Sequence, residues 1–492
     1  MPSKSIAQNS LFVFLARGID TLGGILIILL TARYLVSQYT TAINGQFAVV
    51  VTLIGLTFTL SNAGLAQIII RDVSRDKTLT HSYLRSAFIL RVLFGILSAL
   101  IVIGVSHFMT LDPVMRIGIL IAVTSEMGTV VSWNYINLFN AYERMDYEAI
   151  SSFIFRLLTL LFTVVCILLK LHWVYFFVAM AIGSFSRMAY VYWEGQKLVR
   201  NTTVQEKPVE LYKHMKWIFL QALPIGFALL LTQGYLRIDI LLLKFLVKGP
   251  QADTQVAYFF YPYRLLIEMN ILPVPIIMAL FPVMSRKSFT ETKAIDVQGI
   301  KDLFLPAFKF FFIFSLPVMI FGYLYATPIM TTLFTDKFAP SGPCLQILVW
   351  SSFFVFVELL MEHVLIATGH QKVLFFSNGA CLAVNFVVDF ILIKYAQMGH
   401  IGASIGTVCA YTIIFIILTY YTSKIVPIRE MLGQLPRPLL AGILCAGCFY
   451  FLRDYLWFLM IPLGFLVYIG LLFLIRTFSE KEIDFLKSIA GR

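Results

Sequence analysis

The stretch Gly234–Val247, GYLRIDILLLKFLV, places two charged residues, Arg237 and Asp239, inside a long apolar run that begins near Trp217. A helix rises about 1.5 Å per residue, and the hydrocarbon core of a bilayer is about 30 Å thick. Arg237 stands ten residues before Val247 and would lie roughly 15 Å deep. Because an Arg at that depth costs about 2.5 to 3.5 kcal/mol on insertion scales, it usually faces a protein interior or a wet cavity. We therefore predict a transmembrane helix here and take Arg237 as a candidate functional residue.

The two charges of this stretch cannot face one cavity if the run is a single helix. Residues two apart on an α-helix point about 200° away from each other. A second intramembrane arginine, Arg17, stands 220 positions before Arg237, with Asp20 close to it. We expect Arg237 to face inward, because it matches Arg17, and Asp239 to face a neighbouring helix.

The composition excludes a soluble globular protein. Of 492 residues, 59% are hydrophobic and only 13% are charged, against about 25% charged residues in average chains. The net charge of +12 falls in short loops and not in a basic stripe with interleaved aromatics, so we expect no nucleic-acid partner. The six cysteines lie in or at the ends of apolar segments, which predicts packing residues and no disulfide framework. These features indicate an all-α polytopic membrane protein.

Fourteen apolar runs are long enough to be transmembrane helices. They cover residues 8–31, 43–70, 83–108, 114–138, 149–169, 173–195, 217–247, 256–285, 305–329, 341–369, 373–393, 400–422, 437–453 and 457–475. The first run carries Arg17 and Asp20 and has no small-residue cleavage site, so we expect a permanent span and no cleaved signal peptide. An even number of spans puts both termini on one side.

The basic residues indicate which side that is. Lys and Arg concentrate in the loops that share the N-terminal side, around residues 71–85, 197–216, 286–309 and 424–437, and in the tail after 475. The positive-inside rule then predicts that both termini are cytoplasmic. We expect a multi-pass protein of the cell inner (plasma) membrane.

Nothing in the sequence indicates catalysis. No loop exceeds about twenty-five residues, which leaves no room for an extramembrane catalytic domain. The sequence has no P-loop pattern, nucleophile elbow or metal-ligand cluster. We therefore predict no catalytic and no metal site, and transport becomes the default function.

A weak internal repeat divides the chain. Six spans separate Arg17 from Arg237, and an even number of spans preserves direction, so the halves would be parallel repeats. We predict an N-terminal lobe at 1–195, a cytoplasmic linker at 196–216 and a C-terminal lobe at 217–422. Residues 423–492 would add two helices, free of interior charge and facing lipid, and a cytoplasmic tail.

The intramembrane charges of the first lobe are mostly arginines, which suggests an anionic guest. The alternative is that each arginine pairs with a backbone carbonyl or an acid, or reaches the cytoplasmic surface. These charges are Arg17, Arg91, Arg156 and Arg187, with Asp20 and Glu126 as the acids.

The second lobe is richer in acids. Glu358 and Glu362 stand one turn apart, so their repulsion would favour a bound proton or cation; alternatively, Glu362 simply lies near a helix end. Arg264 and Glu268, also one turn apart, would neutralise each other. The candidate substrate-binding residues are Arg17, Arg91, Arg156, Arg187, Arg237 and Arg264. The candidate ion-coupling residues are Asp20, Glu126, Glu268 and Glu358.

Prolines and glycines mark two further segments. Pro273 and Pro275 interrupt the eighth run, which predicts a kink, either as a moving part of a cavity or as a static bend. Gly399, Gly402 and Gly406 predict close helix packing.

Several motifs resemble those of polysaccharide transporters, the O-antigen-type oligosaccharide flippases of the multidrug/oligosaccharidyl-lipid/polysaccharide exporter superfamily. They are Arg17 with Asp20, Ala32-Arg33-Tyr34-Leu35, Leu236-Arg237-Ile238-Asp239, Leu280-Phe281-Pro282-Val283-Met284-Ser285-Arg286, Ala367-Thr368-Gly369 and Gly399-His400-Ile401-Gly402-Ala403. In Asn44-Gly45-Gln46-Phe47, Phe stands where such proteins often have Tyr. The resemblance implies a V-shaped bundle of two lobes with fourteen helices that works by alternating access.

The resemblance also implies a substrate: an oligosaccharide linked to polyprenyl pyrophosphate, moved from the cytoplasmic to the outer leaflet. Its partners would be membrane lipid, a polysaccharide polymerase and chain-length machinery. We expect a monomer without a cofactor, with coupling to H⁺ or Na⁺ suggested by relatives. Three alternatives stay open: a lipid II flippase, a cation-coupled drug exporter of the same fold, and a membrane enzyme or ligase, which lacks a catalytic constellation.

Overall fold

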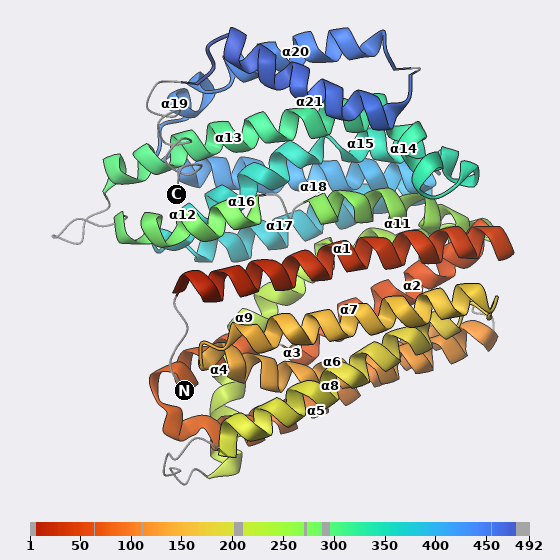
Figure 1. The fold of residues 1–492 in the computed structure, drawn as a ribbon, viewed down its shortest axis with the longest axis vertical. Coiled ribbons are helices and arrows are strands. Elements are labelled where there is room, and N and C mark those ends of the chain that lie inside the picture. Colours follow the sequence, from red (N-terminus) through yellow and green to blue (C-terminus); the bar gives the residue numbers. More distant parts are fainter. Residues whose placement is uncertain are drawn as a thin grey trace. The chain divides into compact units, whose positions relative to one another are not determined.

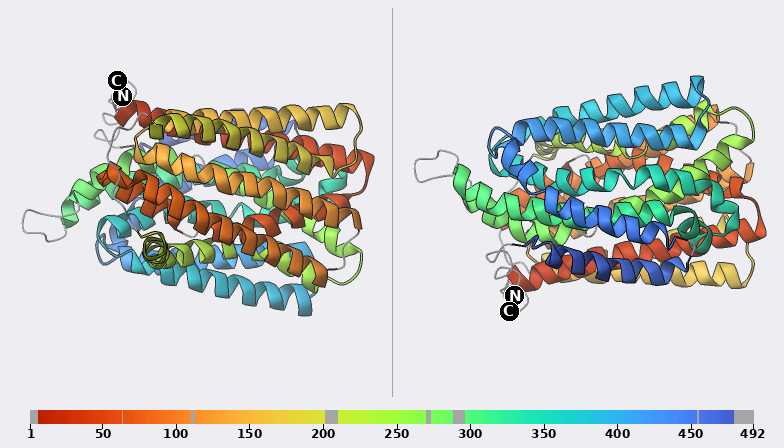
Figure 2. Two further views of the ribbon diagram at one scale, coloured as in Figure 1. Left: turned by 90° about the horizontal axis from the view of Figure 1, so that it is seen from below. Right: turned by 90° about the horizontal axis from the view of Figure 1, so that it is seen from above.

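A computed structural model describes residues 6–62, 64–109, 113–200, 210–269, 273–287, 296–453 and 455–478. The described residues are almost entirely helical and contain no strand, as the composition predicts. The side chains of a few residues in α1 and α12, Arg17 among them, lie outside the description. The chain divides into two compact units, residues 1–257 and 258–492, and each is described by itself (Figures 1 and 2).

The first unit holds α1 to α10 and the first turns of α11. Its helices are α1 (Ile6–Gln38), α2 (Thr41–Thr57), α3 (Thr59–Asn62), α4 (Leu65–Arg75), η1 (Lys77–Leu79), α5 (Thr80–Phe108), α6 (Pro113–Ala141), α7 (Met145–Leu168), α8 (Tyr175–Arg200), α9 (Leu211–Tyr235), α10 (Ile238–Leu246) and α11 (Gln251–Met269). Helix α1 packs along α7, while α8 packs against both α6 and α7 (Figure 1).

The second unit holds the rest of α11 and the remaining helices. They are α12 (Val274–Lys287), α13 (Val297–Leu324), α14 (Ala326–Leu333), η2 (Asp336–Ser341), α15 (Gly342–Leu348), α16 (Ser351–Ala367), α17 (Lys372–Asp389), η3 (Phe390–Tyr395), α18 (Gly399–Thr422), α19 (Ile428–Gly433), α20 (Pro436–Tyr450) and α21 (Trp457–Leu474). Helix α16 packs between α13 and α18, and α17 packs along α18.

The number of membrane-spanning helices differs from the prediction. Ten helices of the described chain are long and apolar enough to cross a bilayer, and the bent pair Asp336–Leu348 and Ser351–Ala367 makes up to eleven. Each of the fourteen predicted runs overlaps a helix, but several are interrupted or short. The chain is therefore a multi-pass membrane protein, and the count of fourteen stays a prediction. The four-part division at residues 195, 216 and 422 also stays a prediction.

The run around Arg237 is not the single helix that the sequence predicts. Helix α9 ends at Tyr235 and α10 begins at Ile238, with Arg237 as its N-cap residue at φ −135° and ψ −12°. The Arg237 amide donates to the carbonyl of Gly234, three residues back, so the last turn tightens where glycine weakens the helix. The expectation that Arg237 and Asp239 point about 200° apart assumes one continuous helix, so it does not apply here. Asp239 is nevertheless fully buried.

The eighth run contains two described helices, and residues 270–272 between them lie outside the description. Helix α11 ends at Met269 and α12 begins at Val274, immediately after Pro273. Leu272, at the predicted kink, lies outside the described residues.

A buried ion pair joins three elements of the first unit. Lys244 Nζ of α10 lies 2.5 Å from Asp253 Oδ1 of α11, and both side chains are nearly buried. Gln46 Nε2 of α2 donates to the other carboxylate oxygen at 3.2 Å. Gly45 allows this approach, because a Cβ there would lie 1.7 Å from the Asp253 carbonyl oxygen. The motif at residues 44–47 therefore marks the place where α2 approaches α11 closely.

The two C-terminal helices pack on one neighbour. Rings of α13, α20 and α21, including Phe321, Phe449 and Tyr468, form one apolar cluster. Phe321 fills the space beside Gly464, where a Cβ would lie 2.0 Å from its ring. The other face of both helices exposes large apolar side chains such as Leu440 and Leu466, as expected of a lipid-facing surface.

The predicted close packing in α18 is confirmed at Gly402 and Gly406, whereas Gly399 has a φ of 52° at the start of the helix. A Cβ at Gly406 of α18 would lie 1.8 Å from Asp389 Oδ1 of α17, and one at Gly402 would lie 3.0 Å from Leu392. These glycines therefore serve close helix packing. All six cysteines are free, so Cys445 and Cys448 form no disulfide.

Candidate functional site

Arg237 contacts helix α2 and its own preceding turn. Its Nε donates to Gln233 Oε1 at 3.0 Å. Its guanidinium lies against Gly55 of α2, where a Cβ would be only 2.3 Å from Nη1. The absence of a side chain at Gly55 therefore makes room for the guanidinium. Arg237 belongs to the first compact unit of the structure, and the predicted lobe boundary at residue 217 stays a prediction.

Arg187 reaches from α8 to α6. It is 7% exposed, and its Nη2 donates to Thr129 Oγ1 at 3.0 Å. Helices α6 and α8 approach closely here, because Ser184 Oγ donates to the Ser125 carbonyl at 2.7 Å. Gly128 faces the same Ser184 side chain. Small polar residues on α6 thus fix the depth and direction of Arg187.

Arg156 and Asp20 form an ion pair between α7 and α1. Arg156 Nε lies 3.0 Å from Asp20 Oδ1, and Ser152 Oγ donates to the other carboxylate oxygen at 3.1 Å. The aliphatic part of Arg156 packs on Gly23, where a Cβ would lie 3.2 Å from it. Asp20, predicted as an ion-coupling residue, is therefore paired with a candidate substrate-binding arginine in this structure.

Phe155 lies beneath two of these arginines. The Arg187 guanidinium carbon is 4.5 Å from the centroid of the Phe155 ring, and that of Arg156 is 5.1 Å away. Cation–π contact on a ring face favours a fixed guanidinium position without consuming its N–H donors. Phe155 therefore orients both arginines while leaving donors for another acceptor.

Glu126 is the second acid of this region. It lies on α6, one turn before Thr129, and the charges of Arg187 and Arg237 both act on its carboxylate. The charge of Arg187 also acts on Asp20 and Arg156. We call Arg156, Arg187, Arg237, Asp20 and Glu126 the arginine cluster. The cluster holds three arginines and two carboxyl groups.

Arg91 lies apart from the cluster and is the most deeply buried arginine of the described chain. It is 1% exposed on α5, and its Nη2 donates to Asn62 Oδ1 of α3 at 3.3 Å. Its Nε and Nη1 have no hydrogen-bond partner among the described protein atoms. A buried guanidinium with free donors is costly, so Arg91 adds a second cationic position to the first unit.

The candidate residues of the second unit are arranged differently. Arg264 Nη2 lies 2.5 Å from Glu268 Oε1, one turn along α11, so the predicted neutralisation is confirmed. Glu358 of α16 is 5% exposed, and its Oε2 has no hydrogen-bond partner among the described atoms. Glu362 lies one turn along the same helix, and its charge acts on Glu358.

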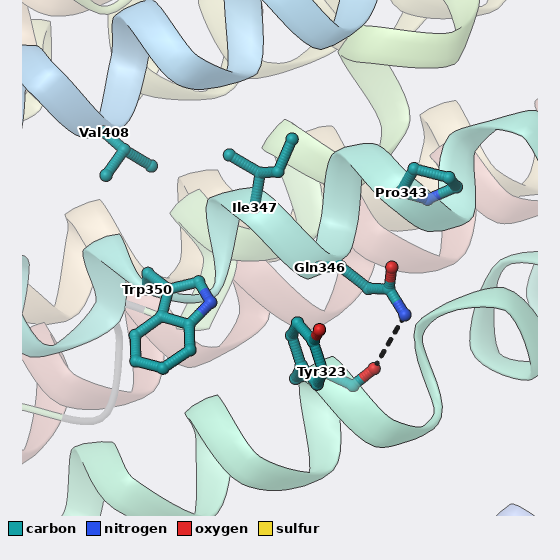
Figure 3. Close-up of a pocket in the computed structure, with 6 residues that line it drawn as sticks. All are labelled: Tyr323, Pro343, Gln346, Ile347, Trp350 and Val408. Atoms are coloured by element: carbon teal, nitrogen blue, oxygen red, sulfur yellow. Dashed lines mark hydrogen bonds between the residues drawn. The ribbon is translucent and has the colours of Figure 1, made fainter.

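A pocket of about 280 Å³ also lies in the second unit, at the bend between α15 and α16 (Figure 3). The Gln346 amide donates to the Tyr323 carbonyl at 3.3 Å, and the Tyr323 and Trp350 rings meet edge to face at 6.2 Å. None of the predicted site residues lines this pocket.

The structure thus links five of the predicted residues in series: Glu126 interacts with Arg237 and with Arg187, and Arg187 interacts with Asp20 and Arg156. Arg17 was predicted to match Arg237, and its side chain lies outside the description. Sequence reasoning missed Gly55, Thr129, Phe155 and Asn62. Gly55 and the pair Gly23-Gly24 were visible signals, because glycine inside a transmembrane run often marks close approach.

The fold and the buried arginines define a class: multi-pass membrane proteins with the fold of exporters of the MOP superfamily. One similar solved structure is the lipid II flippase MurJ in an inward closed conformation, with a TM-score of 0.73 and 16% identity over 94% of this chain and 98% of that chain. Another is an inward-facing multidrug resistance MATE family transporter, with a TM-score of 0.63 and 16% identity over 87% and 96%. A MOP superfamily transporter from Pyrococcus furiosus matches at a TM-score of 0.61 and 16% identity over 85% and 95%.

The family follows from the sequence profile. The profile described as "Polysaccharide biosynthesis protein" matches residues 6–288, which is more than half of the chain. The protein therefore belongs to the polysaccharide biosynthesis protein family, as its motifs indicated. It matches no curated protein significantly.

Proposed function

We propose that the protein is a flippase for an oligosaccharide linked to polyprenyl pyrophosphate, such as the repeat unit of an O-antigen, capsule or exopolysaccharide. It would move this substrate from the cytoplasmic to the outer leaflet by alternating access. The observation that carries the proposal is the excess of arginines over acids among the buried and half-buried side chains of the first unit. Three arginines face two acids in the arginine cluster, and Arg91 has donors to spare.

The chemistry of the guanidinium group supports an anionic substrate of this kind. Its planar fork of N–H donors matches phosphate oxygens in a bidentate way. Burial keeps water from screening the interaction, so a pyrophosphate would be held more strongly than at an exposed site. Phe155 and Thr129 hold Arg187 in advance, which lowers the entropy lost on binding.

The proposal extends to the surroundings of the protein. The flippase would act as a monomer in the inner membrane, with both termini cytoplasmic, next to a polysaccharide polymerase and chain-length machinery. Coupling to H⁺ or Na⁺ would use carboxylates such as Glu126 or Glu358. Labelling of a cysteine introduced at either terminus, in intact and in opened cells, tests the orientation.

The test of the substrate uses reconstituted vesicles. Wild-type protein should move a short-chain polyprenyl-pyrophosphoryl sugar across the bilayer, and Arg187→Ala with Arg237→Ala should lower that rate at least tenfold. Arg116→Ala is the matched control, because Arg116 is exposed at the start of α6. Wild-type protein that moves no such substrate, or a double variant that moves it normally, would contradict the proposal.

The fold likeness to MurJ favours lipid II as the alternative substrate. Lipid II also carries a pyrophosphate between a polyprenyl chain and sugars, so the arginine cluster suits both. A strain depleted of its own lipid II flippase separates them: rescue by this protein supports the alternative, and a viable null mutant that lacks only its surface glycan supports the proposal. Unchanged drug susceptibility on deletion would argue against a drug exporter.

A further inference from the structure

The short helix α19 presents apolar side chains outward at the point where two long helices end. It joins the end of α18 to the start of α20, and Figure 1 draws it where α21 also ends. Met431 is buried, whereas Ile428 and Leu432, one turn apart, are 50% and 55% exposed. The basic residues of the sequence predict that this end of the bundle is cytoplasmic. An apolar outer face at such a position suits the boundary between lipid headgroups and lipid tails.

The exposed charges around α19 are positive. Four basic side chains are exposed along residues 424–437 and at the end of α21, namely Lys424, Arg429, Arg437 and Arg476. Glu430 is the only acid of residues 424–437, and Lys301 Nζ of α13 neutralises it at 2.7 Å. Within the described chain, none of the four basic residues has a carboxylate within 4.0 Å. We call these four residues, with Ile428 and Leu432, the α19 patch.

Two arginines of the patch meet where α20 begins and α21 ends. Arg437 Nη1 donates to the Arg476 carbonyl at 2.9 Å. This hydrogen bond uses one of the five N–H donors of the Arg437 guanidinium, and it brings two positively charged residues together without an acid between them. Phosphate oxygens are good acceptors for guanidinium groups, because the planar fork of N–H donors matches them in a bidentate way.

Arg476 has a backbone conformation that normally belongs to glycine. Its φ is 50°, and the Thr477 amide donates to the Leu472 carbonyl at 2.9 Å, the hydrogen bond that closes a helix after a left-handed residue. A side chain in this conformation costs free energy that glycine would not cost. The Arg476 side chain is exposed, so packing does not compensate for this cost. Such a residue points to a partner outside the chain.

Anionic phospholipid fits the patch better than other anions do. Its headgroup phosphate suits the basic side chains, and its acyl chains suit the exposed Ile428 and Leu432. A soluble phosphate would meet the basic residues but leave the apolar side chains in water. The C-terminal tail at residues 479–492 holds three acids and three basic residues, so it offers no net negative charge.

We propose that the α19 patch binds anionic phospholipid headgroups in the leaflet at this end of the bundle, with Ile428 and Leu432 inserted among the acyl chains. The inference does not depend on the substrate that the protein carries. Helix α19 packs on α13, and Arg437 holds the end of α21. Bound lipid therefore stabilises the part of the second unit where α20 and α21 attach.

The experiment follows thermal unfolding of the full-length protein in maltoside detergent during titration with dioleoylphosphatidylglycerol. Dioleoylphosphatidylcholine and glycerol 1-phosphate are the comparisons for a zwitterionic lipid and for a soluble phosphate. Only the anionic lipid should raise Tm strongly, because it binds the folded state. A basic residue near an anionic surface contributes about fivefold to affinity. Lys424→Gln with Arg429→Gln should therefore raise the apparent Kd for this lipid roughly 25-fold.

Arg476→Gly separates lipid binding from folding. Without lipid it should raise Tm by about 1 to 3 °C, because glycine relieves the left-handed turn. It should also weaken binding of the anionic lipid about fivefold. Lys170→Gly is the matched control: Lys170 ends α7 at φ 51°, and the Leu171 amide donates to the Cys166 carbonyl at 2.9 Å. This control should raise Tm equally and leave lipid affinity unchanged.

Four outcomes would overturn the proposal. Equal stabilisation by phosphatidylcholine, or unchanged affinity for the anionic lipid in both patch variants, would show that the patch does not select anionic lipid. An effect of glycerol 1-phosphate as large as that of the lipid would assign the patch to a soluble anion. Binding that appears only in Glu480→Gln with Glu482→Gln and Asp484→Asn would make the tail the occupant. All four leave the proposed transport function standing, because the vesicle assay tests it separately.

Discussion

The candidate site arginines of the two units are paired in opposite ways. In the second unit, Arg264 meets Glu268 one turn along the same helix at 2.5 Å, so one element closes its own ion pair. In the first unit, Arg156, Arg187 and Arg237 come from separate elements and face acids on two others. A pair within one helix survives any movement between helices, whereas a cluster built across helices changes when they move. The first unit is therefore the one whose electrostatics can respond to transport.

The largest expected effect concerns the local pair. Arg264→Met should lower the stability of the protein by about 2 to 3 kcal/mol, because it leaves Glu268, 11% exposed, as an uncompensated buried charge. The double variant Arg264→Met with Glu268→Gln should recover most of that loss. Thermal unfolding in detergent measures both.

Arg156→Met is the matching change in the first unit. It should cost less, since Asp20 is 40% exposed and Arg156 26% exposed, and since Ser152 still donates to Asp20. Equal losses of stability for Arg156→Met and Arg264→Met would remove the contrast between the units.

A second prediction concerns packing in the second unit. Gly406→Ala should destabilise the protein by about 1 to 3 kcal/mol, because its Cβ would lie 1.8 Å from Asp389 Oδ1. Gly470→Ala is the control, since a Cβ there meets no atom within 4 Å. A Gly406→Ala protein as stable as the control would show that α17 and α18 can separate without cost.

A third prediction concerns the same substitution, glycine to alanine, beside the arginine cluster. In Gly55→Ala the new methyl group would lie 2.3 Å from Arg237 Nη1, and the flexible guanidinium should yield. We expect little loss of stability but a fall in transport of roughly tenfold, the effect of misplacing one charge-assisted hydrogen bond worth about 1.5 kcal/mol.

Gly104→Ala on α5, with open space around its Cβ, is the matched control for transport. Normal transport by Gly55→Ala would mean that Arg237 has no precise place in the site.

The smallest expected effect belongs to Phe155. Phe155→Leu keeps apolar bulk but removes the ring beneath Arg187 and Arg156, a loss of about 0.5 to 1 kcal/mol. Transport should fall two- to fivefold, with the loss in affinity and not in membrane content. Phe155→Tyr, which keeps the ring, should transport normally.

Sequence reasoning succeeded where an interaction is local. The Arg264 and Glu268 pair follows from a spacing of four on a helix, and the start of α12 at Val274 follows from Pro273. The close contact of Gly406 follows from glycine spacing in an apolar run. Each of these needs only the helix to which the residues belong.

Sequence reasoning failed where the partner of a residue lies on a neighbouring helix. The partner of Arg187 is Thr129 on α6, and no pattern within α8 identifies it. The break before Ile238 contains no proline, so the sequence predicts one continuous helix over residues 217–247. The contact of Arg237 with Gly55 of α2 likewise follows from no pattern within that run.

The contact between Phe321 and Gly464 has a consequence for assembly. Ribosomes complete α13 well before α21, so the Phe321 ring lacks its contacts with Phe449 and Gly464 until more than a hundred further residues are made. During that interval we expect lipid tails to surround the side of the ring that Gly464 later covers. The docking of α20 and α21 on α13 is therefore a late step in biogenesis. In this step protein side chains replace lipid tails around the Phe321 ring.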